Sequence, residues 1–390
     1  MGFRYAVLGS GRQGTACAYD LLKFGEADSV LLADQSLAVA QAAAARVNRL
    51  LQTDRAVAVQ LDVTDHSQVK VVLKGIDAFL SAVPYYLNLG IARTAVEAGA
   101  SMCDLGGNTD LVREQLKLDD QARSAGISLV PDCGQVPGMG TTLMVYAMSV
   151  LDEPEEVFMW DGGLPQNPRP PFGYMLTFNI AGLTNEYAEP AFYLRDGKPT
   201  LTPPLEEVEE VEFPLPVGRV EAFTSGGGVS TMPWTFEGKL KTMLNKTIRY
   251  PGHLAQLRAF YDLGLWRTDP IRVGEHEVVP RDFFHTLFEP LVKFPGEKDV
   301  CVIRIRATGR KGGRPTEVVL DLMDLYDEET GFTAMERTTG WDAAIVAGMM
   351  ARRQTPRGAH PVELAVPPAL FVQELAKRGI QVHTRVSTLE

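Results

Sequence analysis

The sequence has little cysteine, no excess of positive charge and no long apolar run. Its four cysteines lie far apart without a CxxC pair, which argues against a disulfide-bonded scaffold. Acids outnumber lysine and arginine by 49 to 38, giving a formal net charge of −11, which argues against a general nucleic-acid binder. The best apolar run, residues 144–151, is too short to cross a bilayer, and no signal-peptide layout is present. We expect a cytoplasmic protein that binds neither nucleic acid nor membrane.

Metal-binding patterns are also lacking. The histidines show neither HExxH nor any other zinc-site spacing, so we expect no metal. What is present is an ordinary globular composition of 390 residues, 45% of them hydrophobic. This length suffices for two or three domains of about 100–200 residues each.

Short apolar runs alternate with helical segments through the first third of the chain. We expect strands at residues 3–8, 30–33, 56–61, 78–80, 101–105 and 127–130. Helices are expected at residues 12–24, 37–51, 87–98 and 110–125, and a shorter helix is expected to begin at Asp65. Apolar strands separated by helices are typical of a parallel sheet that is covered on both faces. The pattern predicts an α/β fold with a doubly wound Rossmann domain over residues 1–136.

Beyond Pro137 the chain becomes rich in proline and glycine. Residues 300–308 and 317–325 flank a turn and predict a β-hairpin, to which residues 332–339 add a third strand. We therefore expect a second α+β, mainly antiparallel domain over residues 137–340 for substrate binding and dimerisation. Residues 341–390, with further helices, are expected to pack back on the first domain. A homodimer or higher homo-oligomer is the default expectation.

A phosphate-binding loop follows the first strand. It consists of Gly9, Ser10, Gly11, Arg12, Gln13 and Gly14 and fits the pattern GxGxxG directly before a helix. Asp34 ends the second strand about 20 residues later, where an acid accepts hydrogen bonds from the ribose hydroxyls of NAD and repels the phosphate of NADP. The alternative is a structural turn with a surface aspartate, and Gln35 and Ser36 leave NADP open. The pattern favours NAD as the cofactor.

Two further strand ends are candidate cofactor contacts. Asp62 and Val63 follow the third strand on the adenine side, and Ala82, Val83 and Pro84 follow the fourth. Ligands bind at the carboxyl ends of strands in doubly wound sheets, although each segment is also compatible with an ordinary strand end.

Several motifs occur in the order found in saccharopine dehydrogenase-like oxidoreductases. They are GSG (9–11), CDLGG (103–107), PDCG (131–134), VPGM (136–139), WDGGLP (160–165), GLTNEY (182–187), EAFTSGG (221–227) and KTIRYPGH (246–253). The chain resembles this family over nearly its whole length, and within it is most similar to the lysine 6-dehydrogenases. One departure is Arg169, which is either solvated or adds a second carboxylate contact.

The resemblance implies NAD-dependent oxidative deamination of the ε-amine of L-lysine, a small amino-acid substrate. The aldehyde product would close to 1-piperideine-6-carboxylate. Saccharopine or another opine-type substrate, or a carboxynorspermidine-type reduction, are the alternatives. A more distant alternative is a nucleotide-sensing protein without turnover.

Three side chains are candidate catalytic bases. An amine with a pKa near 10.4 reacts only as the free base, so a proton acceptor is needed. Asp104 and Asp132 end the fifth and sixth strands near the expected nicotinamide, although each is equally suited to capping loop amides. His253 titrates near neutral pH but is also compatible with a structural role.

Five side chains are candidate substrate ligands. Arg249 has a planar fork that matches a carboxylate bidentately, and Glu221 and Asp161 are candidates for an α-ammonium. Thr224 and Asn179 are neutral hydrogen-bond candidates. Surface ion pairing is the alternative for Arg249 and Glu221.

Overall fold

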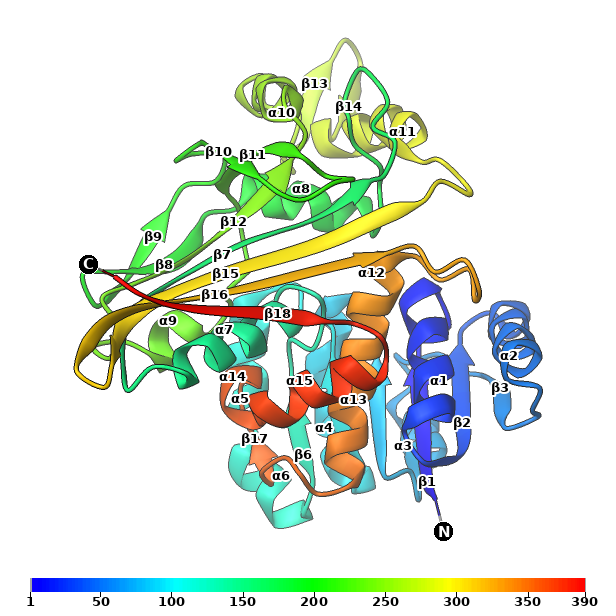
Figure 1. Ribbon diagram of the computed structural model, residues 1–390. Coiled ribbons are helices and arrows are strands. Elements are labelled where there is room, and N and C mark those ends of the chain that lie inside the picture. The colour runs from blue at the N-terminus through cyan, green and yellow to red at the C-terminus, as the bar shows by residue number, and fades with distance from the viewer. Residues whose placement is uncertain (1, 390) are drawn as a thin grey trace.

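Seven parallel strands form one sheet in the order β17-β6-β5-β4-β1-β2-β3 in the computed structural model, which describes residues 2–389 (Figure 1). The strands are β1 (Phe3–Leu8), β2 (Ala27–Asp34), β3 (Ala56–Gln60), β4 (Ala78–Ser81), β5 (Ser101–Asp104), β6 (Ser128–Val130) and β17 (Gly358–Ala359). The strand order reverses between β1 and β4, which creates the switch point where doubly wound folds bind dinucleotides.

Helices connect these strands nearly where the sequence predicts them. They are α1 (Arg12–Phe24), α2 (Leu37–Leu51), α3 (His66–Leu73), the 3₁₀ turn η1 (Tyr85–Leu87), α4 (Asn88–Ala98), α5 (Thr109–Leu116) and α6 (Asp119–Ala125). The single helix expected over residues 110–125 is wrong. It is interrupted at Lys117 and Leu118, where the Leu118 side chain is buried in the core.

A mixed sheet lies above the parallel one in the order β10-β11-β12-β7-β15-β16-β18, with β8 and β9 attached through β12 (Figure 1). Its strands are β7 (Glu153–Pro165), β8 (Ala191–Arg195), β9 (Lys198–Thr202), β10 (Glu209–Glu212), β11 (Arg219–Thr224), β12 (Thr242–Arg249), β15 (Asp299–Lys311), β16 (Arg314–Leu325) and β18 (Val382–Thr388). Only β7 and β12 run parallel. The predicted hairpin is β15–β16, and the two sheets confirm the predicted fold class.

Helices and one small hairpin complete this part of the chain. They are α7 (Met139–Ser149), α8 (Ile180–Ala188), α9 (Met232–Thr235), α10 (His253–Asp262), β13 (Ile271–Val273), β14 (His276–Val278) and α11 (Pro280–Val292). In Figure 1, α10, α11 and the β13–β14 hairpin lie on the side of the mixed sheet that faces away from the parallel sheet.

The third strand expected over residues 332–339 is wrong. This segment forms α12 (Ala334–Glu336) and a π-helical turn, η2 (Arg337–Trp341). Thr333 and Glu336 cap each other's backbone N–H groups, and the buried Asp299 carboxylate accepts hydrogen bonds from the amides of Ala334 and Met335. These side chains satisfy the free amides of a helical turn, which a strand ladder would otherwise pair.

The chain returns to the parallel sheet after η2. It forms α13 (Asp342–Ala351), which lies against β4 and β5, then β17, α14 (Val362–Ala365) and α15 (Pro368–Lys377). Arg378 forms a buried bidentate ion pair with Asp20 of α1, at 2.7 Å for both contacts. One apolar cluster runs from Leu80 of the parallel sheet through Leu143 of α7 to Ile305 of the mixed sheet. Shared packing therefore fixes the two sheets against each other.

Candidate active site

The loop between β1 and α1 has the shape of an anion cradle. A Cβ added at Gly14 would lie 1.9 Å from the Gly9 carbonyl oxygen, and one added at Gly9 would lie 2.6 Å from the Ala82 oxygen. Around Gly11, by contrast, a Cβ would meet nothing within 4 Å. The first turn of α1 contains no acid, and no side chain caps it. Open space beside free amides fits the pyrophosphate of a dinucleotide.

Asp34 stands beside this loop. Its carboxylate accepts hydrogen bonds from the backbone N–H groups of Ser10 and Ser36, both at 3.0 Å. These contacts hold the acid at the end of β2, in the position where the sequence predicts a ribose ligand.

The other predicted cofactor residues differ in their surroundings. Ala82 packs against the loop through Gly9, whereas Val83 is half-buried and Pro84 is exposed. The exposed Asp62 accepts hydrogen bonds from Thr64 within its own turn, beside the half-buried Val63.

Two residues of the phosphate loop, Gln13 and Arg12, differ in their hydrogen bonding. Gln13 has a buried side-chain oxygen without a hydrogen-bond partner among the described residues. Arg12 is bonded to Glu336 at 2.7 Å and to Thr333 at 3.2 Å, so its guanidinium joins the loop to α12.

Asp104 and Asp132 are neighbours at the carboxyl edge of the sheet, but their environments differ. Asp104 is fully engaged: it accepts hydrogen bonds from the Gly106 amide at 2.8 Å, the Gln115 amide group at 2.7 Å and the Asp132 amide at 3.2 Å. Desolvation raises its pKa, which these donors oppose. The arrangement is the loop-capping alternative that the sequence leaves open.

Asp132 is held in a strained position. Its φ angle is +65°, and one carboxylate oxygen accepts a hydrogen bond from the Ser230 hydroxyl, which comes from the loop between β11 and α9. Among residues 2–389, the other oxygen, Oδ1, receives no hydrogen bond. Desolvation, with the nearby charges of Asp104 and Glu363, raises the pKa of Asp132 to about 8. A carboxyl group with this pKa becomes available as a base as the pH approaches about 8.

A second group of polar side chains lies in the mixed-sheet domain, around Arg249 at the end of β12. Its guanidinium donates to the Tyr187 hydroxyl at 2.6 Å, the Thr247 hydroxyl at 2.7 Å and the Ile248 carbonyl at 2.8 Å. The remaining nitrogen, Nη2, lies 3.5 Å from the Glu186 carboxylate. Nε and Nη1 have short hydrogen bonds and only Nη2 has a long contact, so the bidentate fork expected from the sequence is already largely occupied.

Asp161 on β7 belongs to the same group. It is buried and accepts a hydrogen bond from Asn245 of β12. Desolvation and the charge of Glu186 raise its pKa to about 7, although Arg249 opposes this effect. Glu186 has a 32% exposed side chain, so a ligand can reach it, and its pKa is raised by desolvation despite Arg249.

The loop between β11 and α9 connects Asp132 to this group. Besides Ser230, it contains Gly226, whose amide donates to the Glu186 carbonyl at 2.7 Å. It also contains Gly228, where a Cβ would lie 2.1 Å from the Asn245 side-chain oxygen. The buried acids therefore extend from the parallel sheet to Arg249 along one loop.

His253 is adjacent to Arg249 but is sealed from any ligand. Its Nδ1 lies 3.0 Å from the Phe172 carbonyl, and its Nε2 lies 3.1 Å from the Tyr187 hydroxyl. Desolvation and the charge of Arg249 lower its pKa to about 3. With both nitrogens occupied, the geometry argues against His253 as the base.

The three other predicted ligands have partners of their own, although Glu221 of β11 is the cross-strand partner of Arg249. Glu221 accepts from the Gly252 amide at 3.2 Å, Thr224 donates to the Pro203 carbonyl at 2.8 Å, and the exposed Asn179 caps α8. Two residues of this group, Glu186 and Tyr187, were missed in the sequence analysis. Their signal was the motif GLTNEY, in which both stand.

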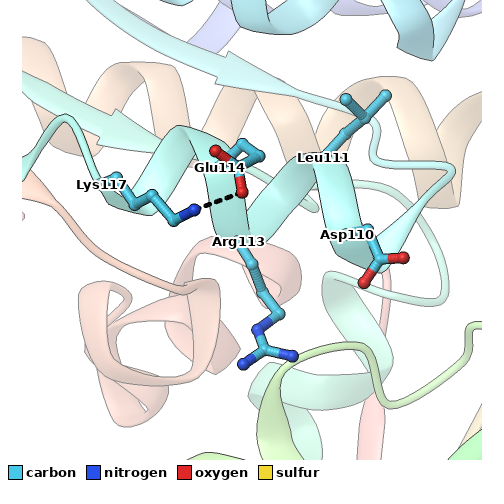
Figure 2. Close-up of a pocket in the computed structure, with 5 residues that line it drawn as sticks. All are labelled: Asp110, Leu111, Arg113, Glu114 and Lys117. Carbon is cyan, nitrogen blue, oxygen red and sulfur yellow. Dashed lines mark hydrogen bonds and ion pairs between the residues drawn. The ribbon is translucent and has the colours of Figure 1, made fainter.

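A surface hollow on α5 has a different character. Figure 2 shows Lys117 paired with Glu114, and Arg113 pointing away from both. The Arg113 guanidinium lies 4.8 Å from the Trp234 ring centroid, so it packs α5 against α9. The hollow contains none of the buried acids.

Within residues 2–389 no helix is long and apolar enough to span a membrane. The same residues form no group of three or more side chains suited to hold a metal ion.

Family models match both parts of the chain. The saccharopine dehydrogenase NADP binding domain matches residues 5–130, and the saccharopine dehydrogenase C-terminal domain matches residues 134–380. The chain belongs to the saccharopine dehydrogenase family. The predicted resemblance is confirmed at this level, and with it an NAD(P)-binding domain in the first part of the chain.

Curated relatives agree. Saccharopine dehydrogenase (NADP+, L-glutamate-forming) of Saccharomyces cerevisiae is 24% identical over 280 residues, which cover 69% of this chain and 60% of that protein. The mitochondrial alpha-aminoadipic semialdehyde synthase of Mus musculus is 24% identical over 346 residues, which cover 70% of this chain and 36% of that protein. The chain therefore spans less than two thirds of the length of these relatives.

Solved structures show the same fold. Apo saccharopine dehydrogenase (L-Glu forming) of Saccharomyces cerevisiae superposes with a TM-score of 0.78 at 19% identity, covering 99% of this chain and all of that one. Homospermidine synthase of Legionella pneumophila, in complex with NAD, gives a TM-score of 0.66 at 14% identity over 99% and 92% of the chains.

Proposed function

We propose that this saccharopine dehydrogenase family member oxidises the ε-amine of lysine, or of a closely similar diamino acid, with NAD. The observation that carries the proposal is the polar group in the mixed-sheet domain: the buried Arg249 beside two acids, the buried Asp161 and the partly exposed Glu186. A guanidinium suits a carboxylate and the acids suit ammonium groups.

The charge balance favours a cationic substrate. Lysine has one carboxylate and two ammonium groups, whereas saccharopine has three carboxylates. When they are ionised, Asp132, Asp161 and Glu186 outnumber Arg249, so a substrate with extra carboxylates would meet repulsion. Arg169, the candidate for a second carboxylate contact, is paired with Glu297 and lies 4.7 Å from the Phe294 ring centroid. Its side chain is 55% exposed, so it does not form a buried carboxylate site.

The reaction balances as R–CH2–NH3+ with NAD+ and water giving the aldehyde, ammonium, NADH and a proton. When bound, the nicotinamide accepts a hydride from the carbon that carries the amine. Asp132 is the favoured base, because Oδ1 is available and its pKa of about 8 suits proton transfer. Burial around Asp132 excludes water, which strengthens the electrostatic effect of each nearby charge.

NAD is favoured over NADP by Asp34, which is fixed by two backbone amides beside the glycine loop. The name of the yeast relative specifies NADP+, so the preference of this chain for NAD is a proposal.

The test is a substrate panel of lysine, ornithine, saccharopine and a carboxylated polyamine, each with NAD+ and with NADP+. Appearance of the reduced nicotinamide is followed by absorbance. We expect turnover with lysine and NAD+, and much weaker turnover with saccharopine. Saccharopine as the preferred substrate would overturn the charge argument. Tight NAD binding without oxidation of any amine would instead indicate a nucleotide sensor.

A further inference from the structure

A chain of hydrogen bonds leads from Arg249 into the interior of the mixed-sheet domain. Arg249 Nε is 2.6 Å from the Tyr187 hydroxyl, that hydroxyl is 3.1 Å from His253 Nε2, and His253 Nδ1 is 3.0 Å from the Phe172 carbonyl. The residues come from β12, α8, the start of α10 and the loop before α8. None of these contacts includes Asp132 or the phosphate loop.

The chemistry of the two ends fixes the direction of every bond. The Phe172 carbonyl can only accept, so Nδ1 of His253 holds the imidazole proton. Burial beside Arg249 keeps the ring neutral, which leaves Nε2 as a bare acceptor for the Tyr187 hydroxyl hydrogen. The Tyr187 oxygen then accepts from the Arg249 Nε–H, which can only donate. Each atom has one possible role.

Aromatic packing holds the chain in place. Tyr187 and His253 are 0% and 1% exposed. The Tyr187 ring packs against Phe223 and Trp266, with centroids 5.8 and 6.0 Å apart, and the His253 ring lies 5.1 Å from Tyr174. The Arg249 guanidinium carbon lies 5.3 Å from the Tyr174 ring centroid. Both rings are enclosed by other aromatic side chains, and a close-packed interior resists their movement.

We propose that Tyr187 and His253 are positioning residues that set the plane of the Arg249 guanidinium, so that Nη2 alone faces the substrate carboxylate. This inference rests on the proposed function, because it assumes that Arg249 binds the carboxylate of the amino acid. Thr247 and Ile248 occupy Nη1, and Tyr187 occupies Nε. Without the Tyr187 hydroxyl the guanidinium is held by short hydrogen bonds at Nη1 alone and loses the contact that fixes its Nε end. A fixed guanidinium loses less freedom when the carboxylate binds.

The experiment compares Tyr187→Phe, His253→Phe and the double variant with the wild type, on whichever amine the wild type oxidises. Tyr187→Phe keeps the ring and removes the hydroxyl. We expect KM for the amino acid to rise about tenfold in each single variant. We expect kcat and the Kd for NAD to change much less. The double variant should be no worse than the single ones, because both remove the same chain. His253→Gln, which restores an acceptor, should recover part of the loss.

The matched control is Tyr5→Phe. The Tyr5 hydroxyl is also buried and donates to a backbone carbonyl, that of Gly25 at 2.8 Å, but in the parallel-sheet domain. It should lower Tm without moving KM. An unchanged KM in Tyr187→Phe, with an active wild type, would overturn the positioning role. An inactive wild type would instead overturn the proposed function.

A measurement without substrate tests the chain itself. In protein labelled with 15N-histidine, we expect His253 as the neutral Nδ1–H tautomer, with an Nε2 resonance that shifts in Tyr187→Phe. The Nε2–H tautomer, or a protonated ring at neutral pH, would contradict the assigned directions.

Discussion

Ser230, in a loop of the mixed-sheet domain, donates its hydroxyl hydrogen to Asp132 at the edge of the parallel sheet. The same loop contains Gly228, which lies against Asn245 of β12, and Asn245 in turn donates a hydrogen bond to Asp161. The environment of the favoured base is therefore built by both domains. A change in how the two sheets pack would alter the pKa of Asp132 as well as its position.

Asp132→Asn should abolish most turnover. The substitution keeps the size of the side chain and removes its charge, and loss of a general base costs about 10²–10⁴ in rate. In the wild type, kcat/KM should rise as pH approaches and passes about 8, because only the deprotonated carboxylate accepts a proton. A pH–rate profile of both proteins provides the measurement. If Asp132→Asn retained the acidic limb of the profile, another group would have to be the base.

The same variant should be more stable than the wild type in alkaline solution. The folded-state pKa of about 8 lies above the unfolded value of about 3.9, so the folded state holds the proton more tightly. Stability of the wild type therefore falls as pH rises through this window, by at most about 1.4 kcal/mol per pH unit. Asparagine lacks this dependence. Tm measured from pH 5 to 9 should show a growing advantage for Asp132→Asn; parallel curves would contradict the raised pKa.

Arg249→Gln should raise KM for lysine about tenfold to a hundredfold, because a hydrogen bond to a charged group contributes about 1.5–3 kcal/mol. The affinity for NAD should not change, since Arg249 contacts no part of the glycine loop. Calorimetric titration with NAD and steady-state kinetics separate the two. An equal loss of NAD affinity would make Arg249 a structural residue of the domain junction.

Asp34→Ser should relax the cofactor preference toward NADP. It removes the negative charge that repels the 2′-phosphate but retains a hydroxyl for the ribose. The ratio of kcat/KM for NADP+ over NAD+ is the readout. An unchanged ratio would remove Asp34 from the ribose contact.

Gly106→Ala should damage activity through Asp132. An added Cβ would lie 2.1 Å from Asp132 Oδ1 and displace the carboxylate. Gly126→Ala is the matched control, because Gly126 has the same φ of +72° but open space around it. Both variants incur the cost of a left-handed alanine, about 1–2 kcal/mol, and Gly106→Ala should lose further Tm through the contact with Asp132. Only Gly106→Ala should lose turnover; equal activities would show that Asp132 can move without harm.

The parallel sheet was predictable from sequence because its strands are continuous apolar runs between amphipathic helices. The predicted boundaries of α1 and α2 agree with the structure. The segment from Phe332 to Thr339 was not predictable in this way. Its helical turn depends on the carboxylate of Asp299, a residue remote in sequence that supplies the hydrogen bonds a strand partner would have supplied.

The residues of the candidate site also differ in whether the local sequence or the tertiary packing determines their surroundings. Asp34 lies where the local pattern of strand, glycine loop and helix places it, whereas Arg249 contacts Tyr187 and Glu186 of α8, which no local pattern shows. Glu221 was chosen as an ammonium ligand over Glu186, and periodicity alone cannot distinguish them. Glu186 is placed beside Arg249 by α8, and this proximity depends on the packing of α8 over β12. His253 looked like a base in isolation, but Phe172 and Tyr187 occupy both of its nitrogens.

The order of the elements along the chain affects how the parallel sheet folds during synthesis. Strand β17 and helix α13 follow the whole mixed-sheet domain, yet α13 covers β4 and β5. While the ribosome makes the intervening residues, the nascent parallel sheet lacks this cover and presents apolar surface. Such exposure promotes aggregation and recruits chaperones. The dinucleotide-binding part of the chain therefore emerges before the mixed-sheet part but can complete its folding only after α13 and β17 have been made.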